Sequence, residues 1–206
     1  MGVVKQPRQV VARFSEPMVA LGDPRAATSP FHIDCPAAGA QRWTDSRTWV
    51  FDFEEELAGG LRCTFTVVDG FTTLVGGAVA PATFRFSTGG PAVRWHHPSH
   101  GEIEENQAIV LGLDATATEA SILEHVFFSA DDVVEKIGVQ IVADEPRAAI
   151  LATLYPELRE GPIVIVQPRQ TLPPGRKVRL VWGAGVATLS GEMNATDHVI
   201  ALETRP

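Results

Sequence analysis

Residues 49–77 read WVFDFEEELAGGLRCTFTVVDGFTTLVGG, and residues 164–192 read VIVQPRQTLPPGRKVRLVWGAGVATLSGE. The two stretches align without a gap at a constant shift of 115 residues. The identical pairs are Leu57 with Leu172, Gly60 with Gly175, Gly70 with Gly185, Thr73 with Thr188, Leu74 with Leu189 and Gly76 with Gly191. A period of this length is too long for a solenoid repeat and matches a whole small domain. The sequence therefore predicts two copies of one module in tandem.

The composition fits two small globular modules and excludes some classes of partner. The chain has 206 residues, of which 45% are hydrophobic and 20% charged, so each half can bury a core. Its net charge of −8, without a Lys/Arg-rich run, argues against binding to nucleic acid or to an anionic membrane surface. No apolar stretch approaches about 18 residues, so we expect no membrane insertion. The N-terminus lacks the apolar core of a signal peptide and leads almost directly into a strand-like run, which we interpret as a fragment of a longer protein.

Short strand signals bounded by Gly- and Pro-rich turns follow one another along the chain, with a long loop over residues 15–30. Such spacing is typical of an antiparallel β-sandwich, so we predict an all-β fold. The predicted strands are residues 9–14, 31–35, 48–53, 61–68 and 83–88 in the first copy, and 93–95, 108–113, 126–129, 138–142, 163–166, 177–182 and 198–202 in the second.

Alternation within these strands predicts which side chains face the core. In residues 48–53 the aromatic side chains occupy alternate positions, as in a half-buried strand. In residues 83–88 we expect Phe84 and Phe86 to face inward and Thr83, Arg85 and Ser87 to face outward.

Gly89, Gly90 and Pro91 mark the junction between the copies, which gives one domain at residues 1–90 and a second at residues 91–206. So short a junction permits limited bending and does not act as a long tether. The second copy carries extra chain over residues 119–160, with a helical turn expected at residues 119–125 and a short helix at residues 144–154. A function specific to the second copy would be expected on this insertion.

The two cysteines, Cys35 and Cys63, both occupy inward-facing positions of predicted strands. A disulfide between them would stabilise the fold by roughly 3–4 kcal/mol on the chain-entropy model and would indicate an oxidising compartment. The alternative is a pair of buried thiols that pack as small apolar side chains.

No group of residues carries the pattern of a catalytic or cofactor site. His96, His97 and His100 have metal-ligand side chains, but adjacent histidines point to opposite sides of an extended chain, so we expect a loop between domains and no metal. We interpret Asp45 with Arg47 as a structural ion pair.

Residues 54–56, an acidic run, are expected in a solvated loop, and Ser15 and Ser46 in turns. There is no nucleophile elbow, phosphate loop or CxxC motif, so we predict no enzyme, no catalytic residues and no cofactor.

Several motifs together resemble a known family. VVARFSEPM at residues 10–18 and the strand-turn-strand pattern of LAGGLRCTFTV and LPPGRKVRLVW resemble bacterial Ig-like domains. FSEPMVALG, CPAAG, RWTDSRTWVFDF, LRCTF and RLVWGAGV are similar to the N-terminal region of bacterial α2-macroglobulin family proteins. The resemblance covers nearly the whole chain.

The resemblance implies a large secreted or periplasmic protease inhibitor, in which cleavage of a bait region triggers covalent capture through a thioester. This chain has no C-x-E-Q thioester motif and no evident bait segment, so its two Ig-like β-sandwich domains would be non-catalytic structural or interaction modules. Their partners would be other domains of the parent protein and, through that parent, proteases. Two alternatives stay open: Ig-like spacer domains of a bacterial surface protein, adhesin, S-layer protein or polysaccharide-acting enzyme, and a stand-alone enzyme or metal-binding protein.

Overall fold

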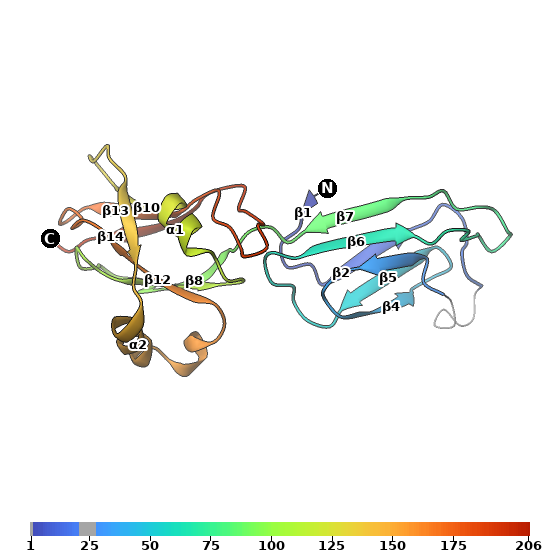
Figure 1. Cartoon of the computed structure of the whole chain (residues 1–206), viewed down its shortest axis with the longest axis horizontal. Helices are drawn as coiled ribbons and strands as arrows, with labels where there is room; N and C mark the ends of the chain where they lie inside the picture. The colour runs from blue at the N-terminus through green and yellow to red at the C-terminus, as the bar shows by residue number, and fades with distance from the viewer. Residues whose placement is uncertain (1, 21–27) are drawn as a thin grey trace. The chain divides into compact units, whose positions relative to one another are not determined.

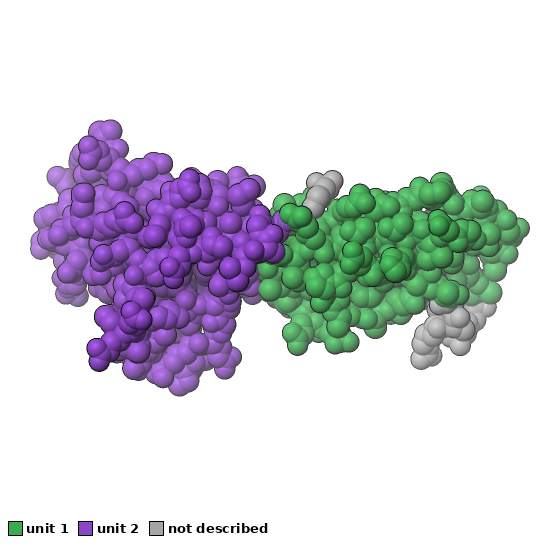
Figure 2. Space-filling model, viewed as in Figure 1, with its two compact units in different colours: residues 1–88 green, residues 89–206 purple. Residues whose placement is uncertain are grey.

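The computed structural model describes residues 2–20 and 28–206, so the predicted loop at residues 15–30 lies partly outside the described residues. The chain divides into two compact units, Met1–Thr88 and Gly89–Pro206 (Figure 2). The boundary falls two residues before the predicted one.

Unit 1 is built from two β-sheets (Figure 1). One sheet has the strand order β1-β7-β6-β3 and the other has the order β2-β5-β4. All pairings are antiparallel except that of β1 with β7. The strands are β1 (Gly2–Val3), β2 (Gln9–Arg13), β3 (Phe31–Asp34), β4 (Gly39–Trp43), β5 (Thr48–Phe53), β6 (Arg62–Val67) and β7 (Thr83–Ser87).

Aromatic side chains from both sheets form the core of unit 1. The alternation in β5 buries Trp49, Phe51 and Phe53, as predicted, and these rings meet Phe31 of β3 and Phe65 of β6. The Phe51 and Phe65 rings make a T-shaped contact with their centroids 5.9 Å apart. Because the core lies between the two sheets, unit 1 is a β-sandwich.

Unit 2 contains a seven-stranded sheet with the order β14-β13-β10-β11-β12-β9-β8. Its strands are β8 (Val93–His97), β9 (Ile109–Leu113), β10 (Val126–Ala130), β11 (Ile137–Ile141), β12 (Ile163–Pro168), β13 (Lys177–Trp182) and β14 (His198–Glu203). Its helices are α1 (Glu119–His125), α2 (Asp144–Thr153) and the 3-10 helix η2 (Pro156–Arg159). Residues from both halves of the sheet share one core, so the sheet folds over on itself.

The strand registers of the two units correspond. Val11 of β2 pairs with Val50 of β5, and Val110 of β9 pairs with Ile165 of β12. Likewise, Ile33 of β3 pairs with Phe65 of β6, and Phe128 of β10 pairs with Leu180 of β13. The same pairing phase in both units shows that the repeated sequence encodes one strand arrangement twice, with β10 and β11 in the places of β3 and β4.

The extent of the predicted insertion was wrong. Residues 119–160 include β10 and β11, which are core strands with counterparts in unit 1, and α1 lies between β9 and β10, the counterparts of β2 and β3. Only residues 44–47 separate β4 from β5, whereas residues 142–162 separate β11 from β12. The additional chain is therefore the segment of α2 and η2, where the predicted short helix is confirmed.

Two side chains of β7 do not follow the predicted alternation. Phe84 is 57% exposed, although its ring contacts Phe31, and Ser87 is 2% exposed. The sequence also gave no signal for β4, because Trp43 is its one large apolar residue and Gln41 and Arg42 are exposed.

A threonine directly after the last strand of each unit is hydrogen-bonded to the residue that precedes the neighbouring strand. The Leu61 amide donates to Thr88 Oγ1 at 2.8 Å, and the Thr88 amide donates to the Leu61 carbonyl at 2.9 Å. In unit 2 the Arg176 amide donates to Thr204 Oγ1 at 3.0 Å, and the Thr204 amide donates to the Arg176 carbonyl at 2.9 Å. The equivalence of the units thus extends to the end of the chain.

The three repeated glycine pairs all have positive φ angles. The values are 84° and 60° for Gly60 and Gly175, 72° and 98° for Gly70 and Gly185, and 85° and 84° for Gly76 and Gly191. Left-handed backbone of this kind disfavours any side chain, which explains why glycine recurs at these turns.

We predict that Gly175→Ala lowers the free energy of unfolding of unit 2 by about 1–2 kcal/mol, because alanine is strained at a φ of 60°. Gly138→Ala is the matched control, since a Cβ there would meet Arg169 Cδ at an ordinary 3.6 Å. Chemical denaturation followed by tryptophan fluorescence measures both. Equal stability of Gly175→Ala and the wild type would contradict the assignment.

Candidate functional site

Cys35 and Cys63 form a disulfide in unit 1, with their Cα atoms 4.3 Å apart. Cys63 is buried in the aromatic core and Cys35 packs against that core. The strand registers place Ala130 and Val178 at the corresponding positions of unit 2, where they pair across β10 and β13. Unit 1 therefore has a disulfide at the position where unit 2 has two apolar side chains, Ala130 and Val178.

Replacing the disulfide with its counterparts, in the double variant Cys35→Ala and Cys63→Val, tests its contribution. The cysteines are separated by 28 positions in the sequence. We expect a loss of roughly 3–4 kcal/mol from unit 1. Unit 2 should unfold as before in calorimetry. A simultaneous loss in both units, or no loss in unit 1, would contradict this assignment.

The three histidines lie within unit 2, so their interpretation as a loop between domains was wrong. His96 and His97 end β8, and His100 lies in the loop that follows. The Nδ1 atom of His96 is 2.8 Å from the Pro98 carbonyl oxygen, and His100 Nδ1 is 3.0 Å from Ser99 Oγ. Within residues 2–20 and 28–206, no group of three or more His, Cys, Asp or Glu side chains is placed to hold a metal ion.

Asp45 acts through the backbone and does not form the predicted ion pair with Arg47. Its carboxylate accepts hydrogen bonds from the amides of Arg47, at 2.7 Å, and Thr48, at 2.9 Å. The Arg47 amide is the main cause that lowers the pKa of Asp45, with the contacts to Thr48 adding to it. Asp45 therefore shapes the turn between β4 and β5.

The remaining polar positions of the sequence lie at the surface or in turns. Residues 54–56 are exposed, as expected of a solvated loop, and Glu56 lies 3.5 Å from Arg8. The Ser46 carbonyl accepts from the Met18 amide at 2.6 Å. Ser15 lies between Phe14 and Met18, whose amides donate to the carbonyls of Arg47 and Ser46, so both serines lie in adjoining turn segments, as predicted.

The α2–η2 segment covers the outer face of the sheet in unit 2 (Figure 1). Leu154 packs against Val110 of β9 and Ile165 of β12, with Trp95 and Leu158 alongside. The Arg159 guanidinium donates to the carbonyls that end α2, including that of Ala152 at 2.9 Å. This segment hence buries apolar surface on the outside of the sandwich.

In unit 2, the side chains of Trp182, Asn194 and Asp114 bind the backbone of residues 91–92, and we call this site the junction seat. Trp182 Nε1 and Asn194 Nδ2 both donate to the Pro91 carbonyl at 2.8 Å. The Asp114 carboxylate accepts from the Ala92 amide at 2.7 Å, and the Asp114 amide donates to the Ala92 carbonyl at 3.0 Å. The seat thus holds the backbone of residues 91–92 by hydrogen bonds.

Gly90 fits this seat because it has no side chain. A Cβ at Gly90 would lie 2.3 Å from the Asn194 amide nitrogen and 2.8 Å from the Val186 carbonyl oxygen. Thr88 is hydrogen-bonded to Leu61 within unit 1, and Gly90 lies close to Val186 and Asn194 within unit 2.

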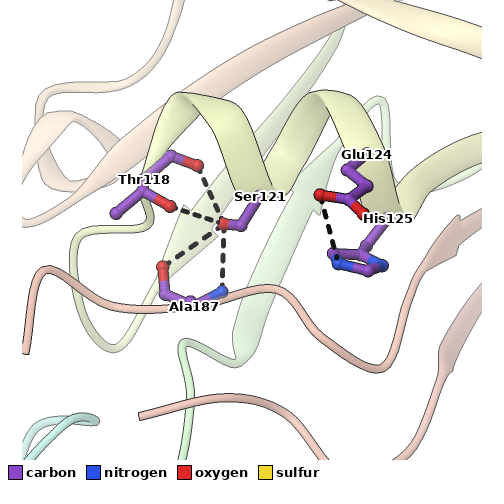
Figure 3. A network of polar contacts seen from close by, with 5 residues as sticks. All are labelled: Thr118, Ser121, Glu124, His125 and Ala187. Carbon is purple, nitrogen blue, oxygen red and sulfur yellow. Dashed lines mark hydrogen bonds and ion pairs between the residues drawn. The ribbon is translucent and has the colours of Figure 1, made fainter. Parts of the chain in front are cut away.

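A polar network holds α1 against the loop that forms the junction seat (Figure 3). Ser121 Oγ accepts from the Ala187 amide at 3.0 Å and donates to the Thr118 carbonyl at 2.9 Å. Thr118 Oγ1 in turn donates to Ser121 Oγ at 2.8 Å. Ser121 is buried and bonded to backbone groups, so we interpret its hydroxyl as a structural tie and not a nucleophile.

His125, one turn further along α1, packs on the same loop (Figure 3). Its carbonyl accepts from the Gly183 amide at 3.0 Å, and a Cβ at Gly185 would lie 2.7 Å from the imidazole ring. Its Nε2 atom is 3.8 Å from the exposed Glu124 carboxylate.

In unit 1, an apolar groove of about 730 Å³ opens between β2 and the sheet of β3, β6 and β7. Its walls include Val10, Phe14, Phe31, Phe65 and Phe84. Ser15 and residues 77–80 also line the groove. The groove offers apolar surface and a strand edge, which suit the binding of an extended peptide more than chemistry on a substrate.

The sequence reasoning missed both the junction seat and the groove. The side-chain amide of Asn194, in the Asn-Ala-Thr stretch of residues 194–196, donates to the Pro91 carbonyl. The available signal was that Asn194 and Val79 occupy the same place in the repeat, one polar and one apolar.

No protein-family model matches this chain, and no curated protein matches it significantly. Among solved structures, the chain is similar to the N-terminal part of the bacterial S-layer protein SbsC, with 11% sequence identity and a TM-score of 0.29. That match covers 100% of this chain and 43% of the other, so this chain spans less than half of that structure's length. Among the described helices, none is long and apolar enough to cross a membrane.

We predict that Ser121→Ala destabilises unit 2 by about 1–3 kcal/mol, because the Ala187 amide loses its acceptor. Ser99→Ala, at an exposed position, is the control and should be neutral. Amide exchange at Ala187 should accelerate in Ser121→Ala alone. Unchanged stability and exchange would show that the network does not hold the loop.

Proposed function

We propose that the two units are tandem Ig-like β-sandwich domains with a non-catalytic, structural or interaction role. One observation carries this proposal: the features common to both units are core side chains, turn glycines and the threonine fastening. Charged and histidine residues differ between them. Positions retained in both copies therefore serve the fold, which is what a module that spaces or presents other parts of a protein requires.

The disulfide of unit 1 supports a compartment outside the cytoplasm. Disulfides persist in oxidising environments such as the periplasm or the extracellular space. Together with the acidic net charge, this favours a periplasmic or extracellular protein with protein partners.

The parent that suits these modules best is a large bacterial α2-macroglobulin-like protease inhibitor, in which they act as scaffold. This assignment depends on the motifs that include RWTDSRTWVFDF. In the structure this segment forms the end of β4, the turn and all of β5. Spacer domains of a bacterial surface protein remain the second candidate, since the same modules would serve there.

The test is made on the native parent protein, detected with an antibody raised against residues 2–206. We expect a polypeptide several times larger than 22.2 kDa that forms covalent complexes when a protease is added. Methylamine, which opens thioesters, should abolish those complexes. A large protein without protease-dependent complexes would favour the surface-protein alternative, and a 22.2 kDa species would overturn both.

A further inference from the structure

One edge of the sheet in unit 1 is open at a position that is covered in unit 2. The strand β2 ends the order β2-β5-β4, so within residues 2–20 and 28–88 it pairs with β5 alone. Its counterpart β9 pairs with β12 on one side and with β8 on the other. In the described part of unit 1, no strand takes the place of β8.

The hydrogen-bond phase shows which backbone groups face this open edge. The Phe14 amide donates to the Arg47 carbonyl at 2.8 Å, and the Phe53 amide donates to the Arg8 carbonyl at 3.0 Å. Pairing alternates along an antiparallel strand, so the backbone groups of Gln9, Val11 and Arg13 point away from β5. In unit 2 the corresponding residues Val110 and Gly112 pair with β8.

The groove of unit 1 corresponds to the junction seat of unit 2. The 115-residue shift matches Val67 with Trp182 and Val79 with Asn194. In unit 2, the side chains of Trp182 and Asn194 both donate to the Pro91 carbonyl. Ser15 matches Asp114, which bonds both backbone groups of Ala92. The positions that enclose residues 90–93 in unit 2 therefore correspond to positions that line the groove of unit 1.

Exposure of matched side chains differs accordingly. Val11 of β2 is 52% exposed, whereas Val110, which the α2–η2 segment covers together with Trp95 of β8, is 1% exposed. Phe84 of β7 is 57% exposed, whereas its counterpart Ile200 is 4% exposed. Exposed apolar side chains beside an unpaired strand edge are a typical site for the addition of a further strand.

We infer that the groove and the β2 edge of unit 1 bind an extended peptide segment, antiparallel to β2, with the chemistry of residues 90–97. That chemistry is a Gly-Pro step, then small apolar residues that enter the groove, then a strand whose backbone bonds Gln9, Val11 and Arg13. The choice of occupant follows from β8, the strand seated on the matching edge. This inference deepens the proposed interaction role and rests on it.

The experiment supplies the segment within the chain. A copy of residues 90–100 joined directly to Gly2 places the added strand in the register of β8. Val4 corresponds to Ile103 through their bonds to Ser87, at 2.9 Å, and Glu203, at 2.8 Å. The matched control has the same extension, with Val93→Asp and Trp95→Pro in the copied segment only. Hydrogen exchange is measured on both and on the unextended chain.

We expect the amides of Gln9, Val11 and Arg13 to exchange about tenfold more slowly, or slower still, in the extended chain than in its control. Unit 2 amides should be unchanged, which verifies folding. Equal exchange in the extended chain and its control would overturn the inference. Protection in the unextended chain that grows with protein concentration would also overturn it, since a second copy would then occupy the edge.

The inference and the proposed function fail separately. Equal exchange in the extended chain and its control removes the peptide groove and leaves the protease-trapping test of the parent unaffected. Loss of the covalent complexes removes the inhibitor assignment and leaves the protection of β2 to be judged by itself.

Discussion

Both units depend on apolar side chains of two central strands, which are buried against each other across the sandwich. In unit 1 these strands are β5 and β6, and in unit 2 they are β12 and β13. A shift of one residue in pairing would turn the side chains that now form the core between the strands to the opposite face of the sheet, so burial fixes the register. Phe65 and Leu180 occupy the same position in the two units, and their partners in register, Ile33 and Phe128, also correspond.

Given that constraint, the differences between the units concern what covers the sandwich. Unit 2 covers its outer face with α2 and η2 and one sheet edge with β8. Unit 1 has neither cover in its described residues, and its sheet bears the Arg42–Asp52 ion pair, 2.6 Å apart, on its surface. Unit 1 instead has a disulfide within its core. The two units therefore have cores with the same strand arrangement, and they differ in the elements that cover their sheets.

Much of the strand arrangement could be predicted from the sequence, because alternation and turn glycines are local signals. Thr48–Phe53 and Lys177–Trp182 were predicted with their correct bounds. β4 was not predicted because it has no alternation of apolar residues around Gln41 and Arg42. Its pairing with β5 depends on the hairpin turn that Asp45 shapes. Phe84 was misplaced because alternation does not reveal whether a facing strand is present to cover a side chain.

The candidate site was beyond local signals for the same reason. The junction seat joins Pro91 to Trp182 and Asn194, which are 91 and 103 positions away in the chain and whose side chains both bind the Pro91 carbonyl. Such contacts leave no periodic pattern in a sequence. They become visible only when the registers of the two units are superimposed, and the same comparison brings out the groove of unit 1.

The central claim is that the two units have the same strand register. Ile33 with Phe65, and Phe128 with Leu180, are the matched pairs, and both lie at non-hydrogen-bonded positions where Hα atoms of opposite strands come close. Nuclear Overhauser spectroscopy on the whole chain measures these contacts directly. We expect an Hα–Hα contact for both pairs. A contact from Ile33 to Thr64 or Thr66 in place of Phe65, without the same slip in unit 2, would contradict the account.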